Sequence, residues 1–134
     1  MEEPHIAQEC AALLQPNSAW RAWQIAKVVM QSQGMRLVLQ ACPFVRVGVG
    51  RMQQVLDVRV HVTDSDTAAQ FVRGPLADGE AVDMGDVHIE PAHGEEVSPD
   101  VQFNRDWLAQ VMQKRGLAPV EGHWWAFVPL ENAK

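Results

Sequence analysis

Apolar residues recur at helical spacing in residues 18–33. The apolar positions follow one another at steps of three and four residues, which places them on one helix face: Trp20, Trp23, Ala26, Val29 and Met30. Asn17 or Ser18 can cap the start of this helix, and Gly34 suits the position just after its end. The pattern therefore predicts an amphipathic helix over these residues.

A second helix is predicted between Ser98 and Gly116. Proline is favoured at the first position of a helix, so Ser98-Pro99 marks the start, and Gly116 marks the end. The apolar face of this helix consists of Trp107, Leu108, Val111 and Met112. A shorter helix is predicted over residues 5–14, where Pro16 stops it.

Alternation of apolar and polar residues predicts the strands. It is clearest in residues 55–62, which divide between two faces: Val58, Val60 and Val62 on one, and Asp57, Arg59 and His61 on the other. Residues 35–39 predict a buried strand, and residues 123–128 predict the last strand. Residues 45–49 fit either an edge strand or a loop loosened by glycine.

The segment between the central strand and the last helix gives weaker signals. Residues 67–72 fit either a helix or a strand, Asp78-Gly79 is typical of a hairpin turn, and residues 86–90 predict a short strand. The order of elements predicts a single α+β domain over residues 1–134, with helices packed on one side of a mostly antiparallel sheet.

Composition excludes some partners and compartments. The chain of 134 residues has a net charge of -6 and forms no basic stripe, which argues against nucleic acid and acidic membranes as partners. No apolar run is long enough for a transmembrane helix, and the acidic start does not fit a signal peptide, so we expect a cytoplasmic protein. We expect Cys10 and Cys42 to be free thiols in a reducing compartment rather than a disulfide.

The C-terminal part of the chain resembles a known family. A helix containing Asn104-Arg105-Asp106-Trp107-Leu108, a glycine stop at Gly116 and the segment His123-Trp124-Trp125-Ala126-Phe127 follow one another. This order is similar to the D-alanyl-D-alanine dipeptidases, zinc peptidases of the Hedgehog/DD-peptidase fold that cleave short cell-wall peptides. The resemblance covers roughly residues 18–130 and is strongest over residues 104–127.

The resemblance also assigns positions in the middle of the chain. The family motif Ser-x-His-x-x-Gly-x-Ala-x-Asp is best matched by residues 48–57, which places Asp57 on the zinc aspartate and Gly50 on a zinc histidine. Asp83-Met84-Gly85 is similar to a later family loop and favours this register over one with Asp83 as the zinc aspartate. The family's arginine after its first strand is not where the pattern would place it near Cys42-Pro43, and we do not assign its role to the nearby Arg46.

The family's tandem tryptophans are bracketed as Glu-Trp-Trp-His by a catalytic glutamate and a zinc histidine. Here His123 and Ala126 stand at those positions. Asp57 is thus the one zinc ligand kept of three, and a catalytic zinc needs three protein ligands. The resemblance therefore implies a degenerate member that has no cofactor, with Asp57 as the candidate metal ligand and His123 as the candidate catalytic residue.

The expected function is that of an inactive pseudo-peptidase that binds a peptide, a small ligand or a partner protein. The candidate ligand-binding residues are Asp57, His123, Trp125 and Arg51. An Asp57–His123 pair would fit a structural hydrogen bond, a residual acid/base pair or half of a metal site. The alternatives are an active zinc dipeptidase with a rearranged site and an unrelated binding or structural protein.

Two further sets of residues bear on a rearranged site. His61 lies on the face of Asp57 but about 13 Å along the strand, too far to share one ion. A loop cluster fits either a surface metal site or a solvated acidic loop, and we favour the loop: His88, Glu90, His93, Glu95 and Glu96. If alternation holds through the last strand, His123 and Trp125 share one face, and Trp124 and Ala126 share the other.

Overall fold

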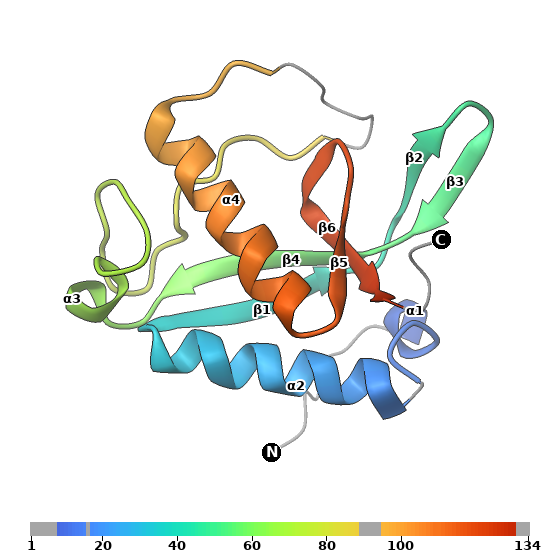
Figure 1. Ribbon diagram of the computed structural model, residues 1–134, viewed down its shortest axis with the longest axis horizontal. Coiled ribbons are helices and arrows are strands. Elements are labelled where there is room, and N and C mark those ends of the chain that lie inside the picture. Colours follow the sequence, from blue (N-terminus) through green and yellow to red (C-terminus); the bar gives the residue numbers. More distant parts are fainter. Residues whose placement is uncertain (1–7, 16, 89–94, 131–134) are drawn as a thin grey trace.

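The protein forms a four-stranded antiparallel sheet with helices on one face (Figure 1). The computed structural model describes residues 8–15, 17–88 and 95–130. The strand order in the sheet is β1-β4-β6-β5. Their bounds are Met35–Ala41 for β1, Leu56–Val62 for β4, His123–Pro129 for β6 and Leu117–Val120 for β5. The predicted α+β class and the antiparallel sheet are confirmed for this part of the chain.

Two long helices cover the apolar face of the sheet. They are α2 (Asn17–Ser32) and α4 (Pro99–Lys114). Their buried side chains join those of the strands in one core, whose members include Trp23 and Met30 of α2, Leu108 and Met112 of α4, and Leu56, Val58, Val60 and Val62 of β4. The predicted alternation of β4 is therefore confirmed, since its valines enter the core and Asp57, Arg59 and His61 face away from it.

The ends of the long helices lie where the sequence signals predict them. The Ser98 side chain accepts a hydrogen bond from the Val101 amide at 3.1 Å, and Pro99 occupies the first turn of α4. Gly34 follows α2 with a φ of 79°. A Cβ there would lie 2.7 Å from the Asp64 carbonyl oxygen, so only glycine fits this turn without displacement.

A separate ribbon of two strands projects from the main sheet. It consists of β2 (Phe44–Gly48) and β3 (Arg51–Gln54), and Figure 1 shows it extending away from the helices. Residues 45–49 are thus mainly strand, whereas β3 was not predicted because Arg51-Met52-Gln53-Gln54 does not alternate. A second core cluster lies between this ribbon and the far face of the sheet: Val45, Val55, Ala118, Val120, Trp125, Ala126 and Val128.

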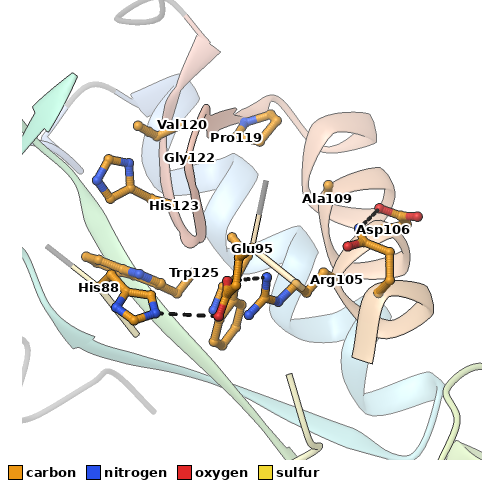
Figure 2. Close-up of a pocket in the computed structure, with 12 residues that line it drawn as sticks. His88, Glu95, Arg105, Asp106, Ala109, Pro119, Val120, Gly122, His123 and Trp125 are labelled. Atoms are coloured by element: carbon orange, nitrogen blue, oxygen red, sulfur yellow. Dashed lines mark hydrogen bonds and ion pairs between the residues drawn. The ribbon is translucent and has the colours of Figure 1, made fainter. Parts of the chain in front are cut away.

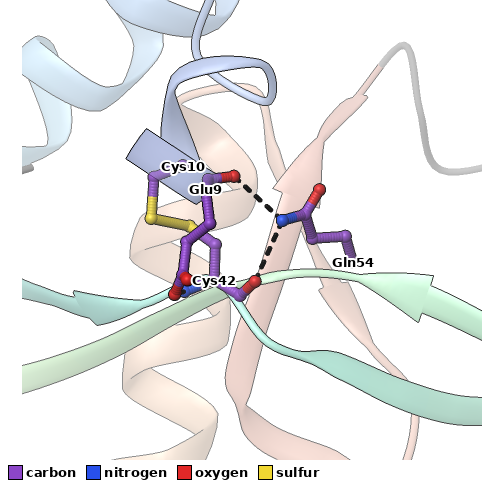
Figure 3. The surroundings of a disulfide bond; sticks show 4 residues. All are labelled: Glu9, Cys10, Cys42 and Gln54. Atoms are coloured by element: carbon purple, nitrogen blue, oxygen red, sulfur yellow. Dashed lines mark hydrogen bonds between the residues drawn. A yellow bond between two sulfur atoms is a disulfide. The ribbon is translucent and has the colours of Figure 1, made fainter. Parts of the chain in front are cut away.

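A disulfide joins the short helix α1 (Gln8–Ala11) to the end of β1. Cys10 and Cys42 are bonded, and both are buried (Figure 3). The Gln54 side-chain amide donates to the carbonyl oxygens of Glu9 and Cys42, at 2.9 and 3.0 Å. The expectation of free thiols is wrong, because folding brings the two Cα atoms to 5.2 Å, within disulfide reach. The cytoplasmic prediction loses the support that it drew from free thiols.

The middle segment departs most from the predicted elements. The ambiguous residues 67–72 contain the end of α3 (Ser65–Ala68) and then a turn. Asp78-Gly79 does turn the chain, but the residues after it pair with β4 instead of forming a hairpin. The Val62 amide donates to the Glu80 carbonyl, and the Val82 amide donates to the Val60 carbonyl. Residues 86–88 are not in a strand, and residues 89 and 90 lie outside the described part of the chain. Residues 5–7 of the predicted first helix also lie outside the described part of the chain.

Candidate functional site

Asp57 and Ala126 are direct neighbours across two strands. They are register partners where β4 pairs with β6. The Asp57 carboxylate is buried, with 7 % of its surface exposed, and it forms an ion pair with the Arg59 guanidinium. Burial raises the pKa of the Asp57 carboxyl, and the charge and hydrogen bond of Arg59 act against that rise. The buried carboxylate thus has a cationic partner from its own strand.

Arg59 also connects Asp57 to the other residues that the sequence singled out. The Arg59 guanidinium lies over the Trp125 ring, 6.0 Å from the ring centroid. Trp125 in turn meets the His123 ring edge to face, with centroids 5.8 Å apart and an interplanar angle of 89°. Three predicted site residues therefore lie on one face of the sheet, joined through an arginine that the sequence analysis did not single out.

The residues at the family's metal positions do not fit a zinc ion. Gly50 and Ala126 have no donor atoms, and Asp57 is already bonded to Arg59. Gly50 lies in the turn of the β2–β3 ribbon with a φ of 70°, between two strands that pair only with each other. Within the described residues, no three His, Cys, Asp or Glu side chains are grouped so that they could hold a metal ion.

Arg51 and His61 stand apart from this group. Arg51 is exposed on β3 and lines a cavity of about 260 Å³ with Gln53, Glu121 and apolar residues of the ribbon and β5. His61 lies farther along β4, opposite Arg36 of β1 and bridged to Ala81. The Arg51 side chain thus belongs to a neighbouring cavity and not to the one beside His123 and Trp125.

A larger cavity of about 270 Å³ lies beside the first half of β6, between α4 and the β5–β6 turn (Figure 2). Its apolar and aromatic wall consists of Ala109, Pro119, Val120, Trp124 and Trp125. Its polar wall includes His88, Glu95, Gln102, Arg105, Asp106 and His123. Aromatic rings and several polar side chains therefore converge on one cavity.

A charged chain crosses the polar wall of this cavity. Figure 2 shows Glu95 between Arg105 and His88, with contacts of 3.0 Å to the Arg105 Nη1 atom and 3.5 Å to the His88 Nε2 atom. The hydrogen bond from Arg105 lowers the pKa of the Glu95 carboxyl, so this group stays ionised at neutral pH. Nearby, the Gln102 amide donates to one Asp106 oxygen at 2.9 Å.

Helix α4 holds this wall through two adjacent residues. Asn104 is fully buried, accepts from the Arg73 amide at 2.8 Å, and donates to the carbonyls of Arg73 and Asp83 at 3.1 Å each. The Arg105 Nε atom donates to the Met84 carbonyl at 2.7 Å. These bonds hold the Asp83-Met84-Gly85 loop through the carbonyls of Asp83 and Met84. The Trp124 indole then donates to the Asp86 carbonyl at 2.8 Å.

Both tryptophans line the same cavity, which the alternation rule did not predict. Trp125 is buried in the ribbon-side cluster with Ala126, and the partly buried Trp124 packs against both clusters. The cause is a break in register: Pro119 pairs with Phe127, but the next residue, Val120, pairs with His123. A bulge of this kind rotates the chain locally, so neighbouring side chains no longer point to opposite faces.

The structure describes only part of the predicted loop cluster of histidines and acids. His88 and Glu95 contact each other, whereas Glu90 and His93 lie outside the described residues. The expected Asp57–His123 pair is replaced, since Arg59 takes the carboxylate and His123 Nδ1 lies 3.1 Å from the Glu121 carbonyl oxygen. The sequence analysis missed the roles of Arg59, Asn104 and Arg105, although polar residues inside helical or strand patterns are a usable signal.

Searches of known protein families, curated protein sequences and solved structures found no match to this chain. None of the helices described is both long and apolar enough to span a lipid bilayer.

Proposed function

We propose that this chain is a catalytically inactive, dipeptidase-like domain that binds a peptide or small ligand in the cavity beside His123 and Trp125. One observation carries the proposal. The positions that the resemblance assigns to two zinc ligands, Asp57 and Ala126, are register partners, and Arg59 neutralises the carboxylate that remains.

Arg59 supplies the charge that a metal would otherwise supply. A buried carboxylate is unfavourable unless an opposite charge and hydrogen bonds compensate it. The guanidinium provides both, and it also packs over Trp125. A zinc ion at Asp57 would have to displace this cation and would gain one protein ligand in place of the three that catalysis needs.

The cavity supports a binding role. It lies directly beside the carboxylate-bearing face, since Trp125 contacts both Arg59 and His123, and it has room for a ligand of dipeptide size. Two indole rings in its wall provide contact area with few rotatable bonds, which lowers the entropy lost on binding. A peptide with D-alanine is the first ligand to test, because the resemblance points to it.

Metal analysis and hydrolysis assays test the inactive assignment. After incubation with zinc and gel filtration, we expect far less than one zinc per chain and no hydrolysis of D-Ala-D-Ala. We also expect the same melting temperature with and without chelator. Stoichiometric zinc that is lost in Asp57→Asn, together with turnover, would establish the active-peptidase alternative instead.

Tryptophan fluorescence tests the binding role. Titration with D-Ala-D-Ala should change the emission of the protein, and Trp124→Leu should remove most of this change. Trp20→Leu is the matched control, because Trp20 is a partly exposed tryptophan on α2 that does not line the cavity. An equal loss of signal in both variants would place the ligand elsewhere.

A further inference from the structure

The smaller cavity, of about 260 Å³, lies between the β2–β3 ribbon and strand β5. Its apolar lining comes from the ribbon, β5 and β6: Val47, Pro119, Val120 and Val128. Two opposite charges line the same cavity, Arg51 from the ribbon and Glu121 from the turn after β5. Both residues are exposed, and neither side chain forms an ion pair with a residue that the structure describes. The cavity thus combines an apolar lining with two charges that have no partner within these residues.

The tip of the ribbon is an exposed valine. Val49 lies between Gly48 and Gly50 in the ribbon turn, and its exposed fraction is 103 %. A Cβ added at either glycine would meet no atom within 4 Å, so the tip projects into open space (Figure 1). Turns favour glycine and small polar residues, and a fully exposed valine contributes no burial to this fold. Phe44 and Met52 of the ribbon are exposed as well. Three exposed apolar side chains on one projecting element indicate a contact surface.

The distribution of charge favours a second copy of this chain as the partner of that surface. Residues 43–56 contain Arg46 and Arg51 but no acidic residue, whereas the whole chain has a net charge of -6. The cationic ribbon is therefore attracted to the acidic remainder of another copy. A twofold axis places residue i of one copy against residue j of the other, and j against i. Because Arg51 and Glu121 line one cavity, such an axis can pair each arginine with the glutamate of the other copy.

We propose that the β2–β3 ribbon and the smaller cavity form the interface of a twofold dimer of this chain. Val49 of each copy enters the smaller cavity of the other copy and packs against its apolar lining. Arg51 of each copy forms an ion pair with Glu121 of the other. The protruding valine and the receiving cavity lie on the same patch, so the contact is reciprocal and closes as a dimer. This inference goes beyond the proposed ligand binding and does not rest on it.

Sedimentation velocity of the full chain, from about 1 μM to about 1 mM, tests the dimer. We expect a shift with concentration to a species with twice the mass of one chain. Val49→Ser should weaken dimerisation about tenfold or more, because the interface loses two buried valine side chains. Val28→Ser is the matched control, since Val28 is an exposed valine on α2 that does not line the cavity. A monomer at the highest concentration, or equal dimerisation of Val49→Ser and Val28→Ser, would overturn the proposal.

An exchange of charges tests the twofold arrangement. Arg51→Glu and Glu121→Arg should each weaken the dimer about tenfold, because each brings like charges together across the interface. The double variant Arg51→Glu/Glu121→Arg should restore dimerisation, since both charges are reversed at once. Arg21→Glu, a charge reversal at an exposed position of α2, is the control and should dimerise like wild type. A double variant that dimerises no better than the single variants, with melting temperatures unchanged, would contradict the pairing of Arg51 with Glu121 and with it the proposed interface.

Discussion

The start and the middle of strand β6 border regions that handle charge in opposite ways. At Ala126, the neighbouring Asp57 is buried and paired with an arginine two residues along its own strand. At His123, the strand borders a cavity where Glu95 and Asp106 have hydrogen-bonding capacity to spare. In the region of Ala126 the buried charge is compensated within the fold, whereas in the region of His123 a carboxylate stays exposed to solvent.

This difference shows two ways in which a fold accommodates a carboxylate. A buried carboxylate is strongly destabilising unless a cation pairs with it, and Arg59 pairs with Asp57 within the same strand. An exposed carboxylate such as Asp106 needs no cationic partner, because water solvates it. The solvated carboxylate is therefore the one that a ligand could reach.

The largest expected effect comes from removing the disulfide, which should lower overall stability without changing ligand binding in the cavity. Cys10 and Cys42 are 32 residues apart, so their bond should stabilise the fold by about 3.5 kcal/mol through the restricted unfolded chain. Urea unfolding of Cys10→Ser/Cys42→Ser should show this loss, and so should wild type under a thiol reductant. Ligand affinity of the folded variant should not change, since neither cysteine lines the cavity. A parallel loss of affinity would mean that the two regions are coupled.

Removing the Asn104 amide should lower overall stability and also disturb the cavity. Asn104→Ala leaves two carbonyls and one amide without their partner, which should lower the free energy of unfolding by about 2–3 kcal/mol. It should also loosen the loop that bonds to Trp124 and Arg105, and so weaken dipeptide binding. Gln110→Ala, an exposed change on the same helix, is the control for helix propensity. Unaltered affinity in a folded Asn104→Ala protein would separate the loop from the ligand site.

Removing Arg59 should lower the stability of the protein in a pH-dependent way, because Asp57 loses its cationic partner. Arg59→Met leaves Asp57 buried without its cation, so the variant should lose about 2 kcal/mol at neutral pH. The folded-state pKa of Asp57 is already raised by burial and should rise further. As the pH falls through that raised value, the folded protein takes up the proton and the deficit relative to wild type should shrink.

Urea unfolding of both proteins at neutral pH and at several lower values measures this change. Arg36→Met, an exposed arginine on the neighbouring strand, controls for the loss of a positive charge. A deficit that is the same at every pH would show that Asp57 does not depend on Arg59.

The elements that local signals specify are the ones that the sequence predicts well. Helix α4 follows from a serine cap, a proline and a glycine stop, and β4 follows from strict alternation. The ribbon strand β3 lacks alternation, and the segment after α3 is held by Asn104 and by edge pairing with β4, which no local pattern encodes. The pairing of Cys10 with Cys42 depends on where β1 ends relative to α1, so counting cysteines did not reveal it.

By itself, the sequence determined the α+β class, the bounds of the long helices, and the absence of donor atoms at Gly50 and Ala126. It did so because propensity, capping and side-chain chemistry are properties of single residues and their neighbours. The tertiary structure alone decided that Asp57 is paired with Arg59, that a bulge turns both tryptophans toward one cavity, and that Arg105 bonds to Met84 and Glu95 in the wall of that cavity. These features depend on strand register and on burial, which arise only when distant segments pack together.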